Sequence, residues 1–244
     1  MKRLFCLVIA ISLSLSTFIV QVSAISDEKV DPNAFICVGT EDETTSRAAT
    51  TFKVYNDKST SYSGYSSSLP TLKTNYSNTS GATAGTYPTR KGVILVTTDA
   101  ITMDIGHSAI VYSSGNVIEA KSTIIVGSNN WNTSKNDCAA VTARGTTRSQ
   151  DANVANWCKN QVGKSYNLNF YNMSTREKFY CSHLVWAGFK DNYNINLNTS
   201  HYDISSSNTA IGPNEFVRVS TNRLFIIYLN NWKSKDFTTN STIY

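Results

Sequence analysis

The segment REKFYCSHLVWAGF, residues 176–189, places a single cysteine, Cys181, at the expected start of an amphipathic helix. Counted from this cysteine, one helical face carries Leu184, Val185, Gly188 and Phe189. The thiol therefore faces the packed side of the helix. The N–H groups of a helix start favour a thiolate, whereas apolar burial favours the neutral thiol. A buried cysteine is on its own most often structural, so a nucleophile at this position needs a partner that takes its proton.

Histidine is the residue type that most often activates a thiol, and the chain contains three of them. His183 lies two residues after Cys181 on the same helix, which turns it toward the opposite side, so we expect a surface or second-layer residue. His201 lies in the polar segment NTSHYDISSS and is expected to be exposed. His107, in IGHSAIVY, falls on a predicted strand. His107 is therefore the candidate base.

An acidic partner for His107 lies 12 residues further on, at Glu119 in the segment NVIEA. A two-residue turn between the two predicted strands would put the two side chains on opposite faces of the sheet. A three-residue loop over 113–115, with Gly115 in the left-handed conformation, instead pairs Ala109 with Glu119. His107 then lies diagonally across from Glu119 on the same face. The sequence Ser-Ser-Gly favours this second arrangement.

A resemblance to a known family rests on three motifs, GHSAIVYSSGNVIEA, FYCSHLVWAGF and IGPNEFVRV. Together they resemble the permuted papain-fold cysteine peptidases of the YycO/YiiX type, relatives of the NlpC-like cell-wall amidases. In ordinary NlpC-like enzymes the cysteine helix precedes the Gly-His strand, whereas here His107 comes 74 residues before Cys181, the order of the permuted group. The resemblance covers residues 87–232. It implies that Cys181 is the nucleophile, His107 the base and Glu119 the residue that orients the histidine.

The residue types fit this chemistry independently, because a thiol needs an imidazole to take its proton and a third group to hold the imidazole tautomer. The backbone N–H groups at a helix start also supply donors for an oxyanion, and the N–H of Cys181 is the first candidate. Tyr180 is a near-site candidate by its position next to the nucleophile. His183 stands where many relatives carry Gln or Glu.

Short apolar runs between turn residues predict strands at 92–96, 106–112, 116–120, 123–127 and 138–145. A helix is predicted over 149–163, with Gly163 as its stop, and the helix of Cys181 follows. The segments EFVRV and LFIIYL predict two closing strands. Strands with inserted helices indicate an α+β domain with a largely antiparallel sheet packed against helices. With the resemblance, this is a papain-like domain, a circularly permuted form of the NlpC-like fold.

Residues 1–24 have a basic start, an apolar middle and a small-residue ending, which is the layout of a secretory signal peptide. Residues 25–86 are poor in aliphatic residues and rich in Ser, Thr and Tyr, so we expect an irregular arm or linker there. Residues 87–232 are predicted to form the hydrolase domain, and residues 233–244 a polar tail. No segment after the signal is long and apolar enough to predict an integral membrane helix.

Removal of the signal lowers the formal net charge from +5 to +3, too little to predict a nucleic-acid partner. The absence of C-x-x-C, H-E-x-x-H and P-loop motifs predicts no metal and no cofactor. Four cysteines remain, Cys37, Cys138, Cys158 and Cys181. If Cys181 is a working thiol, any disulfide joins two of the other three, and the sequence leaves the three possible pairs open.

These observations predict a secreted, extracellular or cell-surface thiol hydrolase that acts as a monomer through an acyl-enzyme on Cys181. The expected substrate is a peptide or acyl amide, and the resemblance to the NlpC-like amidases implies one in the peptidoglycan of a cell wall. Papain-like folds also include lipid acyltransferases and thioesterases with the same order of histidine before cysteine, so an ester or acyl-transfer substrate is an alternative. A third hypothesis is that the protein is not an enzyme but a secreted binding module, with a vestigial triad, that uses the Tyr-rich arm for adhesion.

Overall fold

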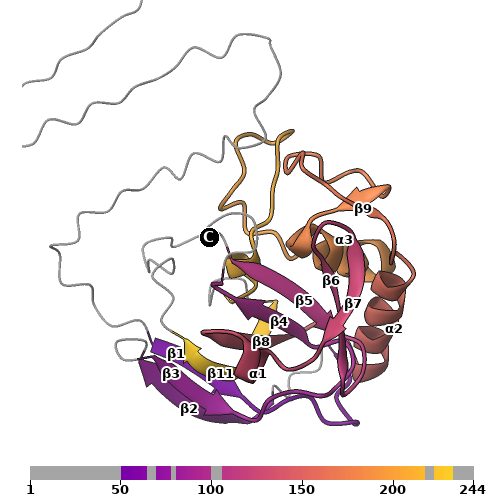
Figure 1. The fold of residues 1–244 in the computed structure, drawn as a ribbon. Helices are drawn as coiled ribbons and strands as arrows, with labels where there is room; N and C mark the ends of the chain where they lie inside the picture. The colour runs from indigo at the N-terminus through magenta and orange to yellow at the C-terminus, as the bar shows by residue number, and fades with distance from the viewer. Residues whose placement is uncertain (1–50, 65–69, 78–80, 100–105, 218–222, 233–244) are drawn as a thin grey trace, which may run out of the picture. The chain divides into compact units, whose positions relative to one another are not determined.

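The computed structural model describes residues 51–64, 70–77, 81–99, 106–217 and 223–232, which Figure 1 draws in colour. The predicted signal peptide, the start of the predicted arm and the predicted C-terminal tail lie outside these residues. Within the described ranges, nine strands form one mixed sheet, and helices pack against it. The predicted α+β class is therefore confirmed.

The strands that carry the candidate residues lie next to one another in this sheet (Figure 1). Their order across the sheet is β8 (Cys138–Ala143), β4 (Ile94–Thr97), β5 (His107–Val111), β6 (Asn116–Ala120) and β7 (Ile124–Ser128). Each strand is antiparallel to its neighbour in this series, and each coincides with an apolar run that predicted it. Every residue of β4, β5 and β8 is buried, which explains why these strands read as continuous apolar runs.

Of the two strands predicted at the end of the domain, one is confirmed. The strand β11 (Leu224–Trp232) pairs with β8 and contains the predicted segment LFIIYL. The strand prediction at EFVRV is wrong in its described part, because Pro213–Val217 forms a short 3-10 helix, η1. The buried Glu215 carboxylate accepts hydrogen bonds from the backbone N–H groups of Gly212, at 2.5 Å, and Thr199, at 2.8 Å. Such bonds to nearby backbone favour a turn over strand pairing.

The expectation of an irregular arm is wrong for its described part. The strands β1 (Thr51–Tyr55), β2 (Leu72–Ser77) and β3 (Ala82–Gly85) join the main sheet, β1 parallel to β11 and β3 antiparallel to it. Phe52 and Val54 on β1 are fully buried. Few apolar residues suffice here because β11, far along the chain, supplies the other side of the contact.

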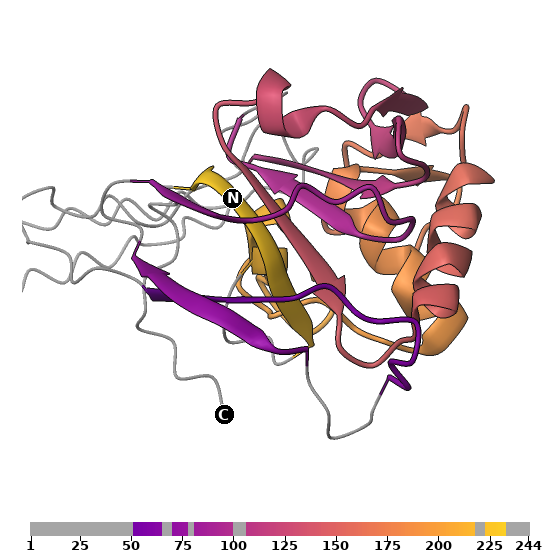
Figure 2. The same cartoon turned by 90° about the horizontal axis from the view of Figure 1, so that it is seen from below.

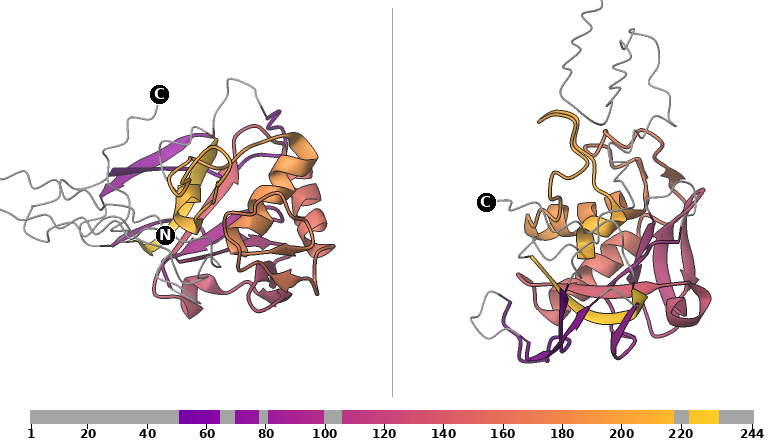
Figure 3. Two further views of the ribbon diagram at one scale, coloured as in Figure 1. Left: turned by 90° about the horizontal axis from the view of Figure 1, so that it is seen from above. Right: turned by 90° about the vertical axis from the view of Figure 1, so that its left-hand side faces the viewer.

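Two longer helices pack against the sheet, α2 (Arg148–Lys159) and α3 (Cys181–Tyr193), and Figures 2 and 3 show them side by side. Gly188 allows their close approach, since a Cβ there would come within 2.8 Å of the Val154 side chain and 3.2 Å of the Cys158 sulfur. The helix α2 ends at Lys159, one turn before the predicted stop at Gly163. Within the described part of the chain, no helix has the length and apolarity to cross a membrane.

Buried charges tie the segment after β1 to the first turn of α2. The Lys58 ammonium lies 2.8 Å from the Asp151 carboxylate, and both side chains are fully buried. The Arg90 guanidinium contacts Asp151 at 2.9 Å and Asp57 at 2.7 Å. Burial lowers the pKa of Lys58 to about 8, although the charge of Asp151 opposes this shift. The Asp151 carboxylate therefore compensates two buried cations, and these cations come from the predicted arm and the start of the predicted domain.

Replacing Asp151 with asparagine should destabilise the protein strongly, because it leaves Lys58 and Arg90 buried without this carboxylate. The expected loss in the free energy of unfolding is about 3 kcal/mol, measured by urea denaturation. Asp191→Asn is the matched control, because its ion pair with Arg176 is partly exposed on both sides and should contribute under about 1 kcal/mol. Equal losses in the two variants would contradict a structural role for the buried network.

Candidate active site

The hairpin of β5 and β6 has the register that the sequence predicted. Ala109 lies opposite Glu119, so residues 113–115 form a three-residue loop. The expected left-handed conformation of Gly115 is wrong, because Gly115 is not among the residues with positive φ. Contacts from outside the hairpin hold the loop instead: the backbone N–H of Asn129 donates to the Gly115 carbonyl at 3.0 Å, and the Asn129 side chain donates to Ser114. The conclusion about faces is unaffected, since it depends on the register.

Gly106 fixes the start of β5 and therefore the position of His107. Its φ of 80° lies in the left-handed region. A Cβ at this position would come within 2.3 Å of the Thr97 carbonyl oxygen. The strand β4 pairs with β5 up to the Thr97–His107 pair, so the backbone can approach this closely only at a glycine. In the Gly-His sequence, the histidine is therefore explained by its chemistry and the glycine by the close approach of the backbone.

His107 and Glu119 form a buried hydrogen-bonded pair. The His107 Nε2 atom lies 2.8 Å from Glu119 Oε2, and the two residues are 2% and 3% exposed. The other carboxylate oxygen of Glu119, Oε1, lies 3.0 Å from the ammonium of Lys121, whose side chain is partly exposed. Burial alone would raise the pKa of Glu119, but the hydrogen bond and charge of His107, and then those of Lys121, hold it below its ordinary value. Glu119 is therefore a carboxylate at neutral pH.

Cys181 is the first residue of α3 and is 4% exposed, and α3 packs against β5, the strand that carries His107. Since Nε2 of His107 faces Glu119, Nδ1 is the ring nitrogen left for the thiol. Burial would raise the pKa of Cys181, but the hydrogen bond and charge of His107 outweigh it. The backbone N–H groups of Ser108 and Ser182 add to the same effect, and the pKa is lowered.

The imidazole of His107 is correspondingly easier to protonate. Burial would lower its pKa, but hydrogen bonds to Cys181 and Glu119, and the charges of both, raise the pKa above the ordinary value. The ring also stacks on Trp131, with centroids 5.4 Å apart and planes at 27°. Trp131, the first residue of the short helix α1 (Trp131–Ser134), is 2% exposed. The site thus favours a thiolate–imidazolium pair shielded from water on one side.

The segment around Ile211 is fixed to both neighbours of Cys181. The Tyr180 hydroxyl accepts a hydrogen bond from the Ile211 backbone N–H at 3.1 Å. The Ser182 hydroxyl donates to the Ile211 carbonyl at 2.6 Å. Tyr180, which precedes Cys181, is 2% exposed, and its hydroxyl is directed to the Ile211 backbone. Neither Ile211 nor Trp131 could be placed here from sequence, because each contacts site residues that are far from it in the sequence.

His183 is fully buried, so the expectation of a surface residue is wrong and its second-layer alternative holds. The rings of Phe179 and Tyr180 lie against it, at 4.9 and 5.1 Å between centroids. Burial lowers the pKa of His183 to about 3, and the charge of Arg176 acts in the same direction, so the ring is neutral at pH 7. Its Nε2–H can then donate to the Met173 carbonyl, 3.0 Å away. His201 is exposed, as predicted.

The three cysteines in the described residues, Cys138, Cys158 and Cys181, are all free and buried. A bridge between Cys138 and Cys158 is therefore not formed, and Cys37 lies outside the described part of the chain. Burial raises the pKa of Cys138 and of Cys158 far above that of an ordinary thiol. Only the pKa of Cys181 is shifted downward among these three. Cys138 and Cys158 can therefore serve as internal controls for the reactivity of the Cys181 thiol.

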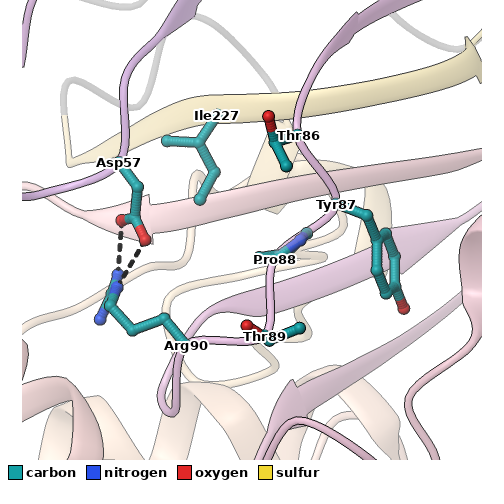
Figure 4. Close-up of a pocket in the computed structure, with 7 residues that line it drawn as sticks. All are labelled: Asp57, Thr86, Tyr87, Pro88, Thr89, Arg90 and Ile227. Atoms are coloured by element: carbon teal, nitrogen blue, oxygen red, sulfur yellow. Dashed lines mark hydrogen bonds and ion pairs between the residues drawn. The ribbon is translucent and has the colours of Figure 1, made fainter.

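A separate hollow of about 200 Å³ lies beside the segment that leads into β4 (Figure 4). Figure 4 shows the Asp57 carboxylate and the Arg90 guanidinium joined at its side. Arg90 belongs to the buried network of Asp151, so its charge is compensated within the protein. The candidate catalytic residues do not line this hollow. Over the ranges that the structure describes, no cluster of three or more His, Cys, Asp or Glu could hold a metal ion.

The fold and the site define a cysteine hydrolase of papain-like type with histidine before cysteine in the chain. Residues 94–220, more than half of the chain, match the family model of the permuted papain-like amidases of the YaeF/YiiX type, the C92 family, and the chain belongs to this family. A crystal structure of metalloprotein yiiX from Escherichia coli O157:H7 is similar at 18% identity and a TM-score of 0.40, over 46% of this chain and 70% of that one. No protein with curated annotation matches the chain.

Proposed function

We propose that the protein is a secreted amidase that cleaves an amide bond in cell-wall peptides, with Cys181 as nucleophile, His107 as base and Glu119 as the group that orients the base. One observation carries the proposal: the His107 ring is hydrogen-bonded to Glu119 at 2.8 Å, and the same ring lowers the pKa of the Cys181 thiol at the start of α3. The same three residue types at these positions satisfy the requirements of thiol catalysis.

In the acylation step, the Cys181 thiolate attacks the carbonyl carbon of the amide and forms a tetrahedral intermediate. The first hydrogen bond within α3 runs from the Leu184 N–H to the Tyr180 carbonyl, so the N–H of Cys181 is not used by the helix. That N–H is the proposed oxyanion donor. The His107 imidazolium then gives its proton to the leaving nitrogen, the C–N bond breaks, and a thioester on Cys181 remains.

In the deacylation step, His107 takes a proton from a water molecule that attacks the thioester. The C–S bond breaks, the carboxylic acid leaves, and the thiolate–imidazolium pair is restored. Glu119 stabilises the imidazolium and holds its Nε2–H, so that Nδ1 faces the thiol in each step. Tyr180 is assigned a positioning role, because its hydroxyl binds the Ile211 N–H.

Export and substrate belong to the same proposal. The first 24 residues have the layout of a signal peptide, so we assign the mature chain, as a monomer, to the outside of the cell or to its surface. A cell-wall peptide is the proposed substrate because the NlpC-like amidases that the motifs resemble act on the wall. Mass spectrometry of the exported protein should show an N-terminus near Ile25.

Product analysis tests the proposal directly. The purified mature protein is incubated separately with peptidoglycan, with tripeptides and with acyl esters, and the products are identified by mass spectrometry. We expect new amine and carboxylate ends in the peptidoglycan peptides, which are absent in a parallel incubation with Cys181→Ala. Cleavage of esters alone, or transfer of an acyl group to an acceptor without net hydrolysis, would instead support the thioesterase or acyltransferase alternative.

A further inference from the structure

Gly127 lies next to the carboxylate of Glu119. It belongs to β7, where it pairs with Val117, while Glu119 pairs with Ile125, so Gly127 and Glu119 are diagonal neighbours on one face. A Cβ at position 127 would come within 2.0 Å of Glu119 Oε1 and 3.0 Å of its Cδ atom. The carboxylate therefore occupies space that any other residue at position 127 would fill with its side chain.

The Glu119 carboxylate has little freedom to move away from such a side chain. Its Oε2 atom is bound to His107 at 2.8 Å, its Oε1 atom is bound to Lys121 at 3.0 Å, and the residue is 3% exposed. Rotation about the Cγ–Cδ bond that clears Oε1 from a new methyl group also moves Oε2 away from the imidazole, because the two oxygens belong to one rigid planar group.

The requirement for glycine at position 127 is steric rather than conformational. Gly127 is not among the glycines with positive φ, so alanine can adopt its backbone conformation without strain. A second position separates the two effects. Gly115 also lacks a positive φ, and a Cβ there would meet nothing within 4 Å. Gly115→Ala is thus a matched control within the same set of hairpins.

We propose that Gly127 is a positioning residue for the reaction, which acts by leaving room for the Glu119 carboxylate to reach His107. The inference rests on the proposed function, since it matters only if Glu119 orients the catalytic histidine. In this role Gly127 contacts neither the thiol nor the substrate. It acts through Glu119 and then through His107.

Gly127→Ala should therefore have the effect of losing Glu119. With the carboxylate displaced, the imidazolium of His107 loses its stabilising partner, and the thiolate of Cys181 forms at higher pH. The rate of alkylation of Cys181 by iodoacetamide, measured against pH, should shift upward by about one pH unit. Peptide mapping assigns the label to Cys181, and circular dichroism and urea denaturation establish that the variant is folded.

Four proteins in addition to the wild type complete the experiment: Gly127→Ala, Gly115→Ala, Glu119→Ala and the double variant Gly127→Ala/Glu119→Ala. We expect an unchanged profile for Gly115→Ala and upward shifts for both Gly127→Ala and Glu119→Ala. The double variant should shift no further than Glu119→Ala, because its new methyl group has no carboxylate to displace.

The outcomes separate the inference from the function on which it rests. A shift in Glu119→Ala with a wild-type profile in Gly127→Ala would overturn the role of Gly127 alone. Additive shifts in the double variant would also overturn it, since Gly127 would then act through a route other than Glu119. An unshifted Glu119→Ala would overturn the proposed role of Glu119 in catalysis, and the inference with it.

Discussion

Replacement of Cys181 by alanine is expected to abolish amide hydrolysis, with turnover reduced by at least about 10³-fold. The sulfur is the atom proposed to bond to the substrate carbonyl, and alanine leaves no nucleophile at this position. The protein should remain folded, because alanine keeps the helix start and removes only one buried sulfur. Turnover is measured by mass spectrometry of the released peptides, and folding by urea denaturation.

Cys138→Ala is the control for this result. Its thiol is also buried and free, but it lies on β8 and its pKa is raised, so it is not a nucleophile. This variant should keep the catalytic rate per folded molecule and lose only some stability. If Cys181→Ala retained substantial turnover, or if Cys138→Ala lost it, the assignment of the nucleophile would be wrong.

Replacement of His107 by alanine is expected to be nearly as damaging, with turnover lowered by about 10² to 10⁴-fold. The variant keeps the thiol but loses both the base and the proton donor for the leaving nitrogen. The Cys181 pKa should rise as well, because the hydrogen bond and charge of His107 are the main factors that lower it. A double variant of Cys181 and His107 should lose little more than Cys181→Ala, since the two residues act as a unit.

His183→Ala is the matched control, because His183 is a buried histidine on the same helix as the nucleophile. It should lower stability by about 1 to 3 kcal/mol, since it removes a buried ring and leaves the Met173 carbonyl without its donor. The rate per folded molecule should change little. The reverse pattern, with an inactive His183→Ala and an active His107→Ala, would contradict both the triad and the permuted assignment.

The candidate triad could be predicted from sequence because each step depends on local periodicity. Strand alternation and loop length relate His107 to Glu119, and the observed pairing of Ala109 with Glu119 is the predicted one. Helical periodicity puts Cys181 on the packed face of α3. The resemblance then brings these two elements together, which periodicity alone does not do. The catalytic roles of the three residues remain predictions until the variants are measured.

The features that the sequence did not predict depend on contacts between residues that are far apart in the sequence. The strands β1 and β3 pair with β11, at the other end of the domain, so the composition of the arm gave no indication of them. His183 is buried because the preceding segment, with Phe179 and Tyr180, covers it. Trp131 stands in a polar segment, and only the fold shows that it stacks on His107. Sequence thus indicated the chemistry better than the surroundings that support it.

The pH dependence of Cys181 alkylation in the wild-type protein tests whether Cys181 and His107 form a thiolate–imidazolium pair. Each cysteine-containing peptide is quantified after brief exposure to iodoacetamide across a pH series, in the native protein and in His107→Ala. We expect Cys181 to react well below the pKa of about 8.5 of an ordinary thiol, Cys138 and Cys158 to stay unlabelled, and the Cys181 profile to move to higher pH in His107→Ala. A wild-type profile that rises only near the ordinary thiol pKa, unchanged in His107→Ala, would contradict the thiolate–imidazolium pair and the mechanism built on it.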